Sequence, residues 1–120
     1  MPVQIGARYE LIAGHWLPLV PEGHKCRRPH GHNYTIEIAL TGTVRDDGFI
    51  IDFFDLDKAV KPLLDRCDHR MLNEIEGLEN PTAEIIATWL RNRVGAQLPP
   101  GITVVHVKVW ETPTCFAVSS

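Results

Sequence analysis

Hydrophobic and polar residues alternate along the first third of the chain, which is the pattern of half-buried β-strands. The first alternating segment covers residues 4–13, and His15 has the parity of its apolar positions. Residues 18–31 are rich in proline, glycine and charge, and residues 32–41 alternate again. The pattern therefore predicts two strands joined by a long polar loop.

Two further strands are predicted from turn signals. Asp46-Asp47-Gly48 is typical of a hairpin that returns the chain antiparallel into a short third strand at residues 49–51. Pro99-Pro100-Gly101 predicts a turn before a final strand from Ile102 to Thr112. One face of this last strand is expected to hold Val105, Val107 and Val109.

After the predicted third strand, the spacing of hydrophobic residues changes to that of an α-helix. Asp52 or Asp55 can cap this helix. Because Pro62 lacks the N–H of a helix hydrogen bond, we expect a kink there or a helix whose first turn starts late. Its apolar stripe consists of Leu56, Ala59, Val60, Leu63, Leu64 and Cys67.

A second helix is predicted after Asn80, which can cap it, with Pro81 and Glu84 at its start. Gly95 is expected to end it. Its apolar face consists of Ile85, Ile86, Trp89, Leu90 and Val94.

The elements predict an α+β fold in the order β-β-β-α-α-β. The strands form a four-stranded antiparallel sheet, with both helices on one face. A length of 120 residues suits a single domain, residues 1–120. Since such a sheet has exposed edges, we expect subunits to associate and extend or close it.

Composition narrows the class of protein. The net charge is −3 and most lysines and arginines are scattered, which argues against nucleic-acid binding. The sequence has no apolar run near the roughly 20 residues that span a bilayer, and no features of a signal peptide. Cys26, Cys67 and Cys115 are odd in number and widely spaced, which argues against a disulfide framework. We therefore expect a cytoplasmic protein that binds neither membrane nor nucleic acid.

His30 and His32 are the first candidates for metal ligands. Residues two apart on a strand project to the same face, and Gly31 lets the backbone pass close behind them. With His15 they offer three imidazoles, and three imidazoles with one open position are typical of catalytic zinc. The alternative is that His15 belongs to the core and the other two bind polar backbone where the strand begins.

Cys26 lies between Lys25 and Arg27, where positive charge favours the thiolate. It is a candidate base or nucleophile; the alternatives are a fourth zinc ligand or an unreactive loop thiol. Lys25, Arg27 and Arg28 can bind a phosphate chain, or can form a solvated basic loop.

Two acidic positions complete the candidate chemistry. Asp68 can orient the adjacent His69 for proton transfer, although the same residues can simply end a helix. Glu111 has the parity of a buried position and needs a partner. Adjacent N–H donors, such as an amino-pyrimidinone edge, would suit its two oxygens; otherwise it reaches water. His24 and His106 are expected to be structural or surface residues.

Taken together, these residues resemble the 6-pyruvoyltetrahydropterin synthase family nearly from end to end. The motifs that carry the resemblance are His15, Cys26-x-x-x-His30-Gly31-His32, Asp52-Phe53, Asp68-His69-x-x-Leu72-Asn73, Pro81-Thr82-x-Glu84 and Glu111-Thr112. Gly23-His24-Lys25-Cys26 and Gly77-Leu78-Glu79-Asn80-Pro81-Thr82 are most similar to its bacterial branch, the 6-carboxytetrahydropterin synthases.

The resemblance implies the tunnelling fold, in which trimers form a strand barrel and stack into a homohexamer with active sites between subunits. The implied Zn²⁺ ligands are His15, His30 and His32. The implied catalytic residues are Cys26 and, from a neighbouring subunit, Asp68 and His69. Glu111, assisted by Thr112, is implied to anchor the pterin, and Lys25 of the basic loop is the expected phosphate contact.

The bacterial branch implies a lyase that converts 7,8-dihydroneopterin triphosphate into 6-carboxy-5,6,7,8-tetrahydropterin, acetaldehyde and triphosphate. This reaction belongs to the biosynthesis of queuosine and other deazapurines, and no external redox cofactor is implied. One alternative is a 6-pyruvoyltetrahydropterin synthase, which eliminates triphosphate but keeps the three-carbon side chain. The other is a non-catalytic, zinc-dependent pterin-binding protein.

Overall fold

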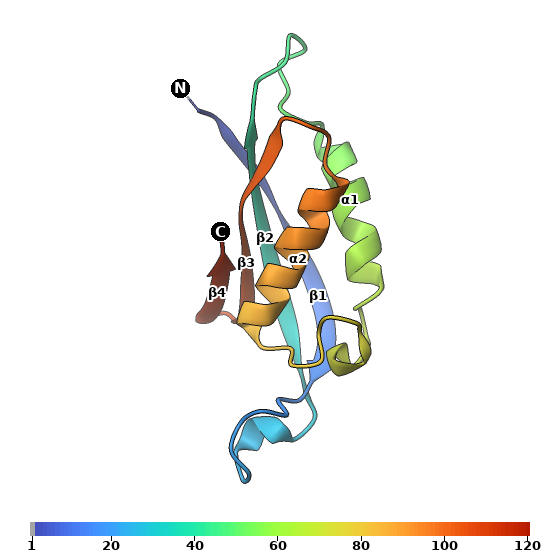
Figure 1. Ribbon diagram of the computed structural model, residues 1–120, viewed down its shortest axis with the longest axis vertical. Helices are drawn as coiled ribbons and strands as arrows, with labels where there is room; N and C mark the ends of the chain where they lie inside the picture. Colours follow the sequence, from blue (N-terminus) through green and yellow to red (C-terminus); the bar gives the residue numbers. More distant parts are fainter. Residues whose placement is uncertain (1) are drawn as a thin grey trace.

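The computed structural model describes residues 2–120 as one antiparallel sheet of four strands, with two α-helices packed on it (Figure 1). The strands lie side by side in chain order. They are β1 (Gln4–His15), β2 (His30–Gly42), β3 (Ile102–Thr112) and β4 (Cys115–Ser119). The helices are α1 (Phe53–Asp65) and α2 (Ala83–Gln97), and the 3₁₀ turns are η1 (Lys25–Arg27) and η2 (Leu72–Glu74).

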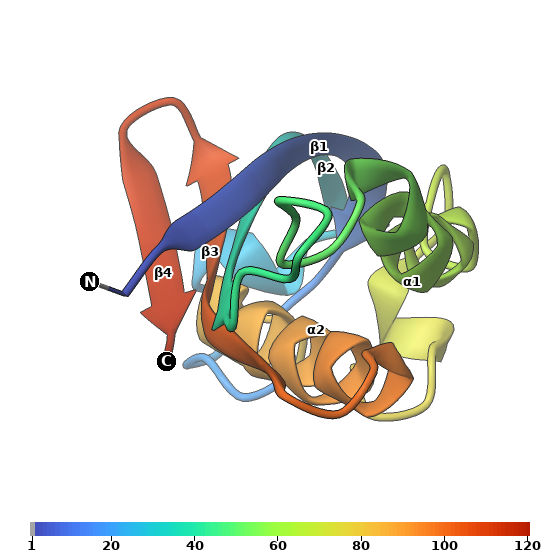
Figure 2. The same cartoon turned by 90° about the horizontal axis from the view of Figure 1, so that it is seen from above.

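Both helices cover the same face of the sheet, as predicted (Figure 2). The alternation in β1 and β2 decides which face this is, because the apolar parity of both strands points to the helices. Tyr34, Ile36, Ile38 and Leu40 of β2 are fully buried there. The predicted stripe of α1 is buried from Leu56 to Cys67 and packs against them.

The predicted order of elements is wrong at one strand. Residues 49–51 form no strand, because Asp47 and Gly48 close a tight turn in which Arg45 N–H donates to the Phe49 carbonyl and Phe49 N–H to the Asp47 carboxylate. The chain then enters α1 directly. The fourth strand is β4, which was not predicted, so the order is β-β-α-α-β-β.

The predicted buried face of β3 is partly wrong, because the strand contains a β-bulge. Leu40 pairs with Val104 and the preceding Ala39 pairs with His106, so Val105 has no residue opposite it. An extra residue shifts the alternation by one position. Ile102 and Val104 therefore face the core together with Val107 and Val109, whereas Val105 does not.

The helix boundaries follow from their caps. The Asp52 carboxylate accepts from Phe54 N–H, so α1 starts at Phe53 and includes Pro62 without a late first turn. Thr82, and not Asn80, caps α2, since its hydroxyl accepts from Ile85 N–H. The helix passes the predicted end at Gly95 and continues to Gln97, while Ile85, predicted on its apolar face, is 40% exposed.

Within residues 2–120, neither helix has the length and apolar character that crossing a bilayer requires.

Candidate metal and catalytic site

Strand pairing brings the predicted metal ligands together. His15 is the last residue of β1 and lies opposite His30, the first residue of β2. His32 follows two residues later and projects to the same face, toward α2. The long loop between these strands leaves and re-enters the sheet at this point, so residues 15 apart in sequence become neighbours.

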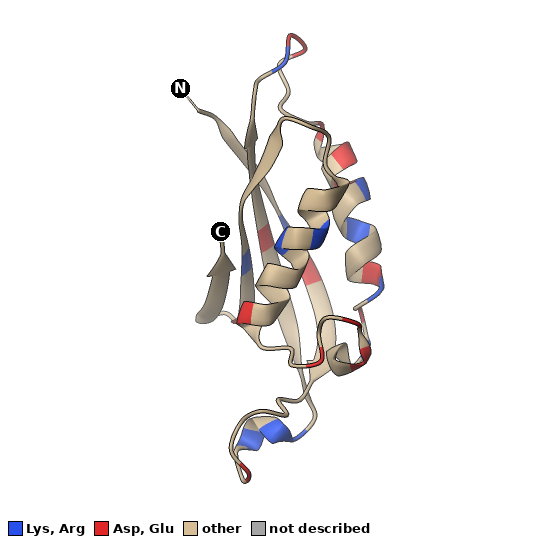
Figure 3. Cartoon of the chain, viewed as in Figure 1, with Lys and Arg blue, Asp and Glu red and all other residues tan. Residues whose placement is uncertain are grey.

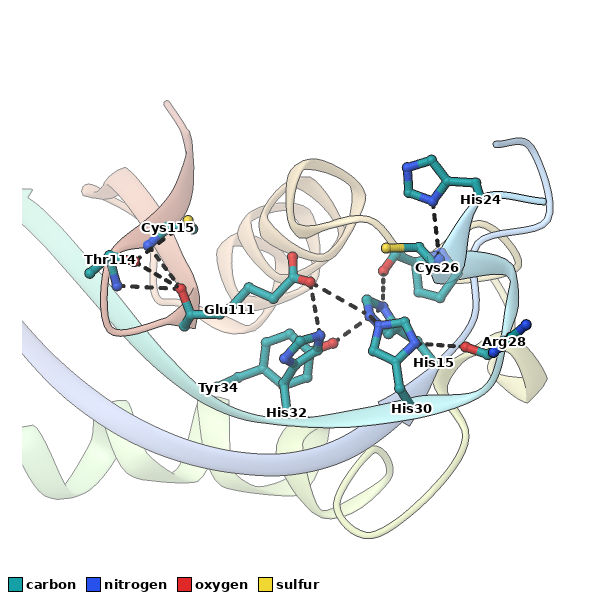
Figure 4. A network of polar contacts seen from close by, with 12 residues as sticks. His15, His24, Cys26, Arg28, His30, His32, Tyr34, Glu111, Thr114 and Cys115 are labelled. Atoms are coloured by element: carbon teal, nitrogen blue, oxygen red, sulfur yellow. Dashed lines mark hydrogen bonds and ion pairs between the residues drawn. The ribbon is translucent and has the colours of Figure 1, made fainter. Parts of the chain in front are cut away.

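The three imidazoles converge with Glu111 on one small volume (Figure 4). The Nε2 atoms of His15 and His30 are 3.0 Å apart, and the Oε1 atom of Glu111 lies 2.9 Å from His32 Nε2 and 3.7 Å from His15 Nε2. One possible ligand atom from each residue lies within 4.8 Å of all the others. His15 is completely buried beneath the group.

Backbone carbonyls fix the tautomers of two of these histidines. Nδ1–H of His15 donates to the Pro81 carbonyl at 2.8 Å, and Nδ1–H of His30 donates to the Arg28 carbonyl at 2.7 Å. In a neutral imidazole the proton on Nδ1 leaves a lone pair on Nε2. The two lone pairs therefore face each other across 3.0 Å, an arrangement that a cation between them would stabilise.

The donor set fits a zinc ion. Two ligands at about 2.0–2.1 Å from a tetrahedral zinc are about 3.3 Å apart, and the Nε2 atoms of His15 and His30 are 3.0 Å apart, close to that value. His32 Nε2 is buried and has no hydrogen bond of acceptable direction, despite its closeness to Glu111. Burial lowers the pKa of both His15 and His32, which keeps them neutral and able to bind a metal.

A second bulge in β3 presents Glu111 to the histidines. Trp110 pairs with Phe116 and Thr112 pairs with Cys115. Glu111 is therefore an extra residue that has no residue opposite it in β4. Bulges often redirect a side chain beside an active site. The carboxylate expected to need a partner is thus found at the histidine group.

A pocket of about 560 Å³ opens above the histidines, and most of the other residues predicted to belong to the site line it. Its lining is Lys25, Cys26, Arg28, Pro29, His30, His32, Glu111 and Thr112. The positive charges of η1 stand together in this projecting loop (Figure 3). Arg27 is used differently, because its guanidinium donates to the Val20 carbonyl at 3.0 Å and braces the loop.

The other two thiols are outside this pocket. Cys67 is buried in the core, where burial raises the pKa of its thiol to about 11 and keeps it protonated, in agreement with its predicted place on the apolar stripe. Cys115 is exposed at the start of β4, and hydrogen bonding by the Thr112 and Thr114 side chains lowers its pKa.

Asp68 and His69 form a pair, but not at the histidine group of their own chain. The Asp68 carboxylate accepts from His69 Nδ1–H at 2.8 Å, which holds the Asp68 pKa below its usual value, and from the backbone N–H of Ile12. His69 N–H donates to the Ile12 carbonyl. The pair therefore lies along the outer edge of β1, with both side chains exposed.

Sequence reasoning gave no role to three groups that hold the site. The Pro81 carbonyl orients His15, and the buried Tyr34 hydroxyl lies 3.3 Å from the same Nδ1 atom. The Asn73 side chain accepts from Trp16 N–H and donates to Trp16 C=O, fixing the chain directly after His15. The parity of Tyr34 in β2 could have placed it near His32, whereas the other two contacts depend on tertiary structure alone.

The fold and site define the class of protein: a tunnelling-fold protein with a histidine group at one end of its sheet that could hold a metal ion. A solved structure of 6-pyruvoyl tetrahydropterin synthase from Caenorhabditis elegans superposes with a TM-score of 0.90 at 24% identity, covering all of this chain and 96% of the other. This likeness confirms the predicted tunnelling fold of the single chain. The chain belongs to the 6-pyruvoyl tetrahydropterin synthase family, whose model matches residues 4–120.

Relatives within the family carry enzyme names, which confirms the predicted enzyme class. The 6-carboxy-5,6,7,8-tetrahydropterin synthase of Bacillus subtilis is 36% identical over 118 residues, covering 90% of this chain and 78% of that protein. The dihydroneopterin monophosphate aldolase of Pyrococcus furiosus is 35% identical over 82 residues, covering 68% of this chain and 69% of that protein.

Proposed function

We propose that this chain is a zinc-dependent lyase that converts 7,8-dihydroneopterin triphosphate and one water molecule into 6-carboxy-5,6,7,8-tetrahydropterin, acetaldehyde and triphosphate, an early step toward queuosine. The observation that carries the proposal is the pocket that joins Cys26 and Lys25 to a histidine group with facing lone pairs. The name of the Bacillus subtilis relative agrees with this reaction.

His15, His30 and His32 would hold the zinc ion, and Glu111 would remain outside the ligand set. A bound zinc supplies Lewis-acid chemistry that lowers the pKa of hydroxyl groups on the substrate side chain. Three protein ligands leave one position for substrate, whereas a fourth, from Glu111, would give the closed coordination of a structural site.

Cys26 is the proposed proton carrier, because its thiol lines the same pocket as His30 and His32 (Figure 4). It removes a carbon-bound proton from the substrate side chain and returns one later in the reaction. Reduction of the pterin ring is then matched by oxidation of its own side chain, so no external redox cofactor is required.

Glu111 and the basic loop orient the substrate at opposite ends. The carboxylate accepts hydrogen bonds from the adjacent N–H groups of the pterin ring, with Thr112 beside it in the pocket. Lys25 and Arg28, which line the pocket, contact the phosphates, while Arg27 does not, since Val20 holds it. Fixing both ends keeps the reacting carbon over the metal site.

Asp68 and His69 supply the second proton carrier to a neighbouring subunit. The pair is exposed on the outer edge of β1, where it bonds the backbone of Ile12, and β1 ends the sheet, so another chain can associate along this edge. Association at sheet edges into a homohexamer would place the pair at the Cys26 of the neighbouring subunit.

Product analysis tests the proposed reaction. Purified zinc-loaded protein is incubated with dihydroneopterin triphosphate, and products are identified by mass spectrometry, with Cys26→Ala as the inactive control. A 6-carboxy product with acetaldehyde supports the proposal. A product that keeps the three-carbon side chain identifies a 6-pyruvoyltetrahydropterin synthase instead, and bound but unchanged substrate identifies a pterin-binding protein.

The phosphate chain offers a second comparison. Because a Pyrococcus furiosus relative is named for a monophosphate substrate, dihydroneopterin monophosphate is tested in parallel. Two cationic side chains at the pocket favour the triphosphate, so its kcat/KM is expected to be higher. Faster turnover of the monophosphate would contradict the proposed substrate.

A further inference from the structure

The loop that carries Cys26 has almost no apolar anchorage. Its 3₁₀ turn, η1, contains no buried residue, and Leu19 earlier in the loop is 79% exposed. Leu17 and Val20 are only partly buried, so hydrophobic packing fixes the position of the thiol weakly. Polar contacts within the loop contribute most of the restraint.

Two hydrogen bonds hold the backbone of Cys26. Its carbonyl accepts from Leu17 N–H at 2.8 Å, which ties η1 to the segment leaving β1. Its N–H donates to the Nδ1 atom of His24 at 3.0 Å (Figure 4). The first bond sets the distance of the turn from the sheet, and the second sets the direction in which the turn starts.

His24 acts as the cap of η1. In addition to the bond from Cys26, its own N–H donates to the Pro21 carbonyl and its carbonyl accepts from Arg27 N–H. A side chain that accepts from the N–H two residues later is the geometry that Asp52 uses to cap α1. Unlike aspartate, a neutral imidazole caps the turn without placing a negative charge beside the thiol, where it would disfavour the thiolate.

We propose that His24 is a positioning residue for Cys26: its imidazole holds the backbone of η1 so that the thiol faces the metal site. The proposal rests on the proposed function in so far as Cys26 is the proton carrier. His24 belongs neither to the histidine group nor to the residues that line the pocket, and its imidazole reaches the site through its hydrogen bond with Cys26.

Three full-length variants separate positioning from other effects. His24→Ala removes the acceptor, His24→Asn replaces it with an amide oxygen that can cap at the same spacing, and His106→Ala removes a histidine elsewhere on the sheet. Each is loaded with zinc. Hydrogen exchange of the Cys26 amide is measured by NMR, and kcat and KM are measured with dihydroneopterin triphosphate.

We expect His24→Ala to speed Cys26 amide exchange about fivefold, the effect of losing one exposed cap. We also expect kcat to fall about tenfold or more with little change in KM, because the thiol is displaced and the substrate contacts remain. His24→Asn should restore both values, and His106→Ala should alter neither.

Amide exchange separates failure of this proposal from failure of the proposed function, because it requires no turnover. Unchanged exchange in His24→Ala overturns the positioning role even if the enzyme proves to have another substrate. Faster exchange with unchanged kcat overturns its importance for catalysis. If His24→Asn restores the exchange rate but not kcat, the positioning role is also overturned, because the imidazole would then contribute more than the capping hydrogen bond.

Discussion

At the scale of single residues, the site depends on which nitrogen of each histidine is free. The carbonyls of Pro81 and Arg28 accept hydrogen bonds from Nδ1–H of His15 and His30, so both Nε2 atoms point inward without hydrogens. Outer hydrogen bonds of this kind fix the tautomer of metal-binding histidines. His32 adds a buried nitrogen with no directed hydrogen bond, and Glu111 lies against it.

The role of Glu111 is decided by comparing metal content with substrate binding. Glu111→Gln is expected to retain zinc but raise KM for the pterin about tenfold or more, because an amide replaces one acceptor oxygen with a donor. Zinc is measured by elemental mass spectrometry, with His30→Ala as the reference that loses metal. Loss of zinc from Glu111→Gln would make this residue a ligand and remove it as the pterin anchor.

The buried histidines also predict how stability depends on pH. Burial holds the pKa of His15 and His32 below the ordinary histidine value of about 6.5, so the unfolded chain takes up protons first as the pH falls. Stability of the metal-free protein is therefore greatest above about pH 7 and declines below it, before carboxylates titrate.

Urea unfolding of the metal-free protein at about pH 7.5 and about pH 5.5 measures this dependence. His15→Asn removes one of the titrating groups and should reduce the difference between the two free energies of unfolding. Equal stability of the wild-type protein at both values would show that the histidines do not remain neutral when buried.

At the scale of elements, two bulges in β3 decide what the strand presents to each neighbour. The bulge at Val105 shifts the alternation of inward and outward side chains by one residue, so that Val104 and Val107 both face the core. The bulge at Glu111 interrupts pairing with β4 and leaves the carboxylate facing the histidines. One strand thus packs against helices along its middle and contributes to the pocket at its end.

Valine truncation tests the first bulge. Val107→Ala should lower the free energy of unfolding by about 2 kcal/mol, since two fully buried methyl groups are lost. Val105→Ala, the matched control, should cost less than about 0.5 kcal/mol. Both values are obtained from urea denaturation. If Val105→Ala lowers the free energy of unfolding more than Val107→Ala does, Val105 faces the core and β3 alternates without a bulge.

At the scale of the whole molecule, the site is incomplete within one chain under the proposed mechanism. Cys26 lines the pocket, whereas Asp68 and His69 lie along the outer edge of β1 and bond to Ile12. The chain is elongated, 56 Å by 25 Å by 21 Å, with the loop of Cys26 projecting at one end (Figure 1). Association of subunits would bring the exposed pair and a projecting loop together.

Mixing two inactive variants tests whether the proton carriers act across subunits. Cys26→Ala and His69→Ala are each expected to lose activity by about 10²-fold or more. When their subunits are exchanged in one assembly, some interfaces pair an intact Cys26 with an intact His69, and activity should return. Native mass spectrometry verifies that mixed assemblies form. Mixed assemblies without activity would place both carriers in the same chain.

Much of the architecture could be predicted because it depends on local patterns. The parity of β1 and β2 identifies the buried face, and the stripe of α1 is buried as predicted. The errors occur where pairing with distant residues overrides the local signal. Residues 49–51 look like a strand but form part of a turn, and Cys115–Ser119 pairs with β3 despite its short, half-exposed pattern.

The sequence by itself determined the candidate chemistry: the donors His15, His30 and His32, the thiol of Cys26, and the family to which their motifs belong. Their spacing limits which residues can share a face, because side chains alternate along a strand. Only the tertiary structure decided that the Nε2 atoms face one another, that Glu111 joins them and that His24 caps the turn of Cys26. These contacts depend on the register of β1 with β2, the bulge in β3 and the conformation of a loop, which no local pattern specifies.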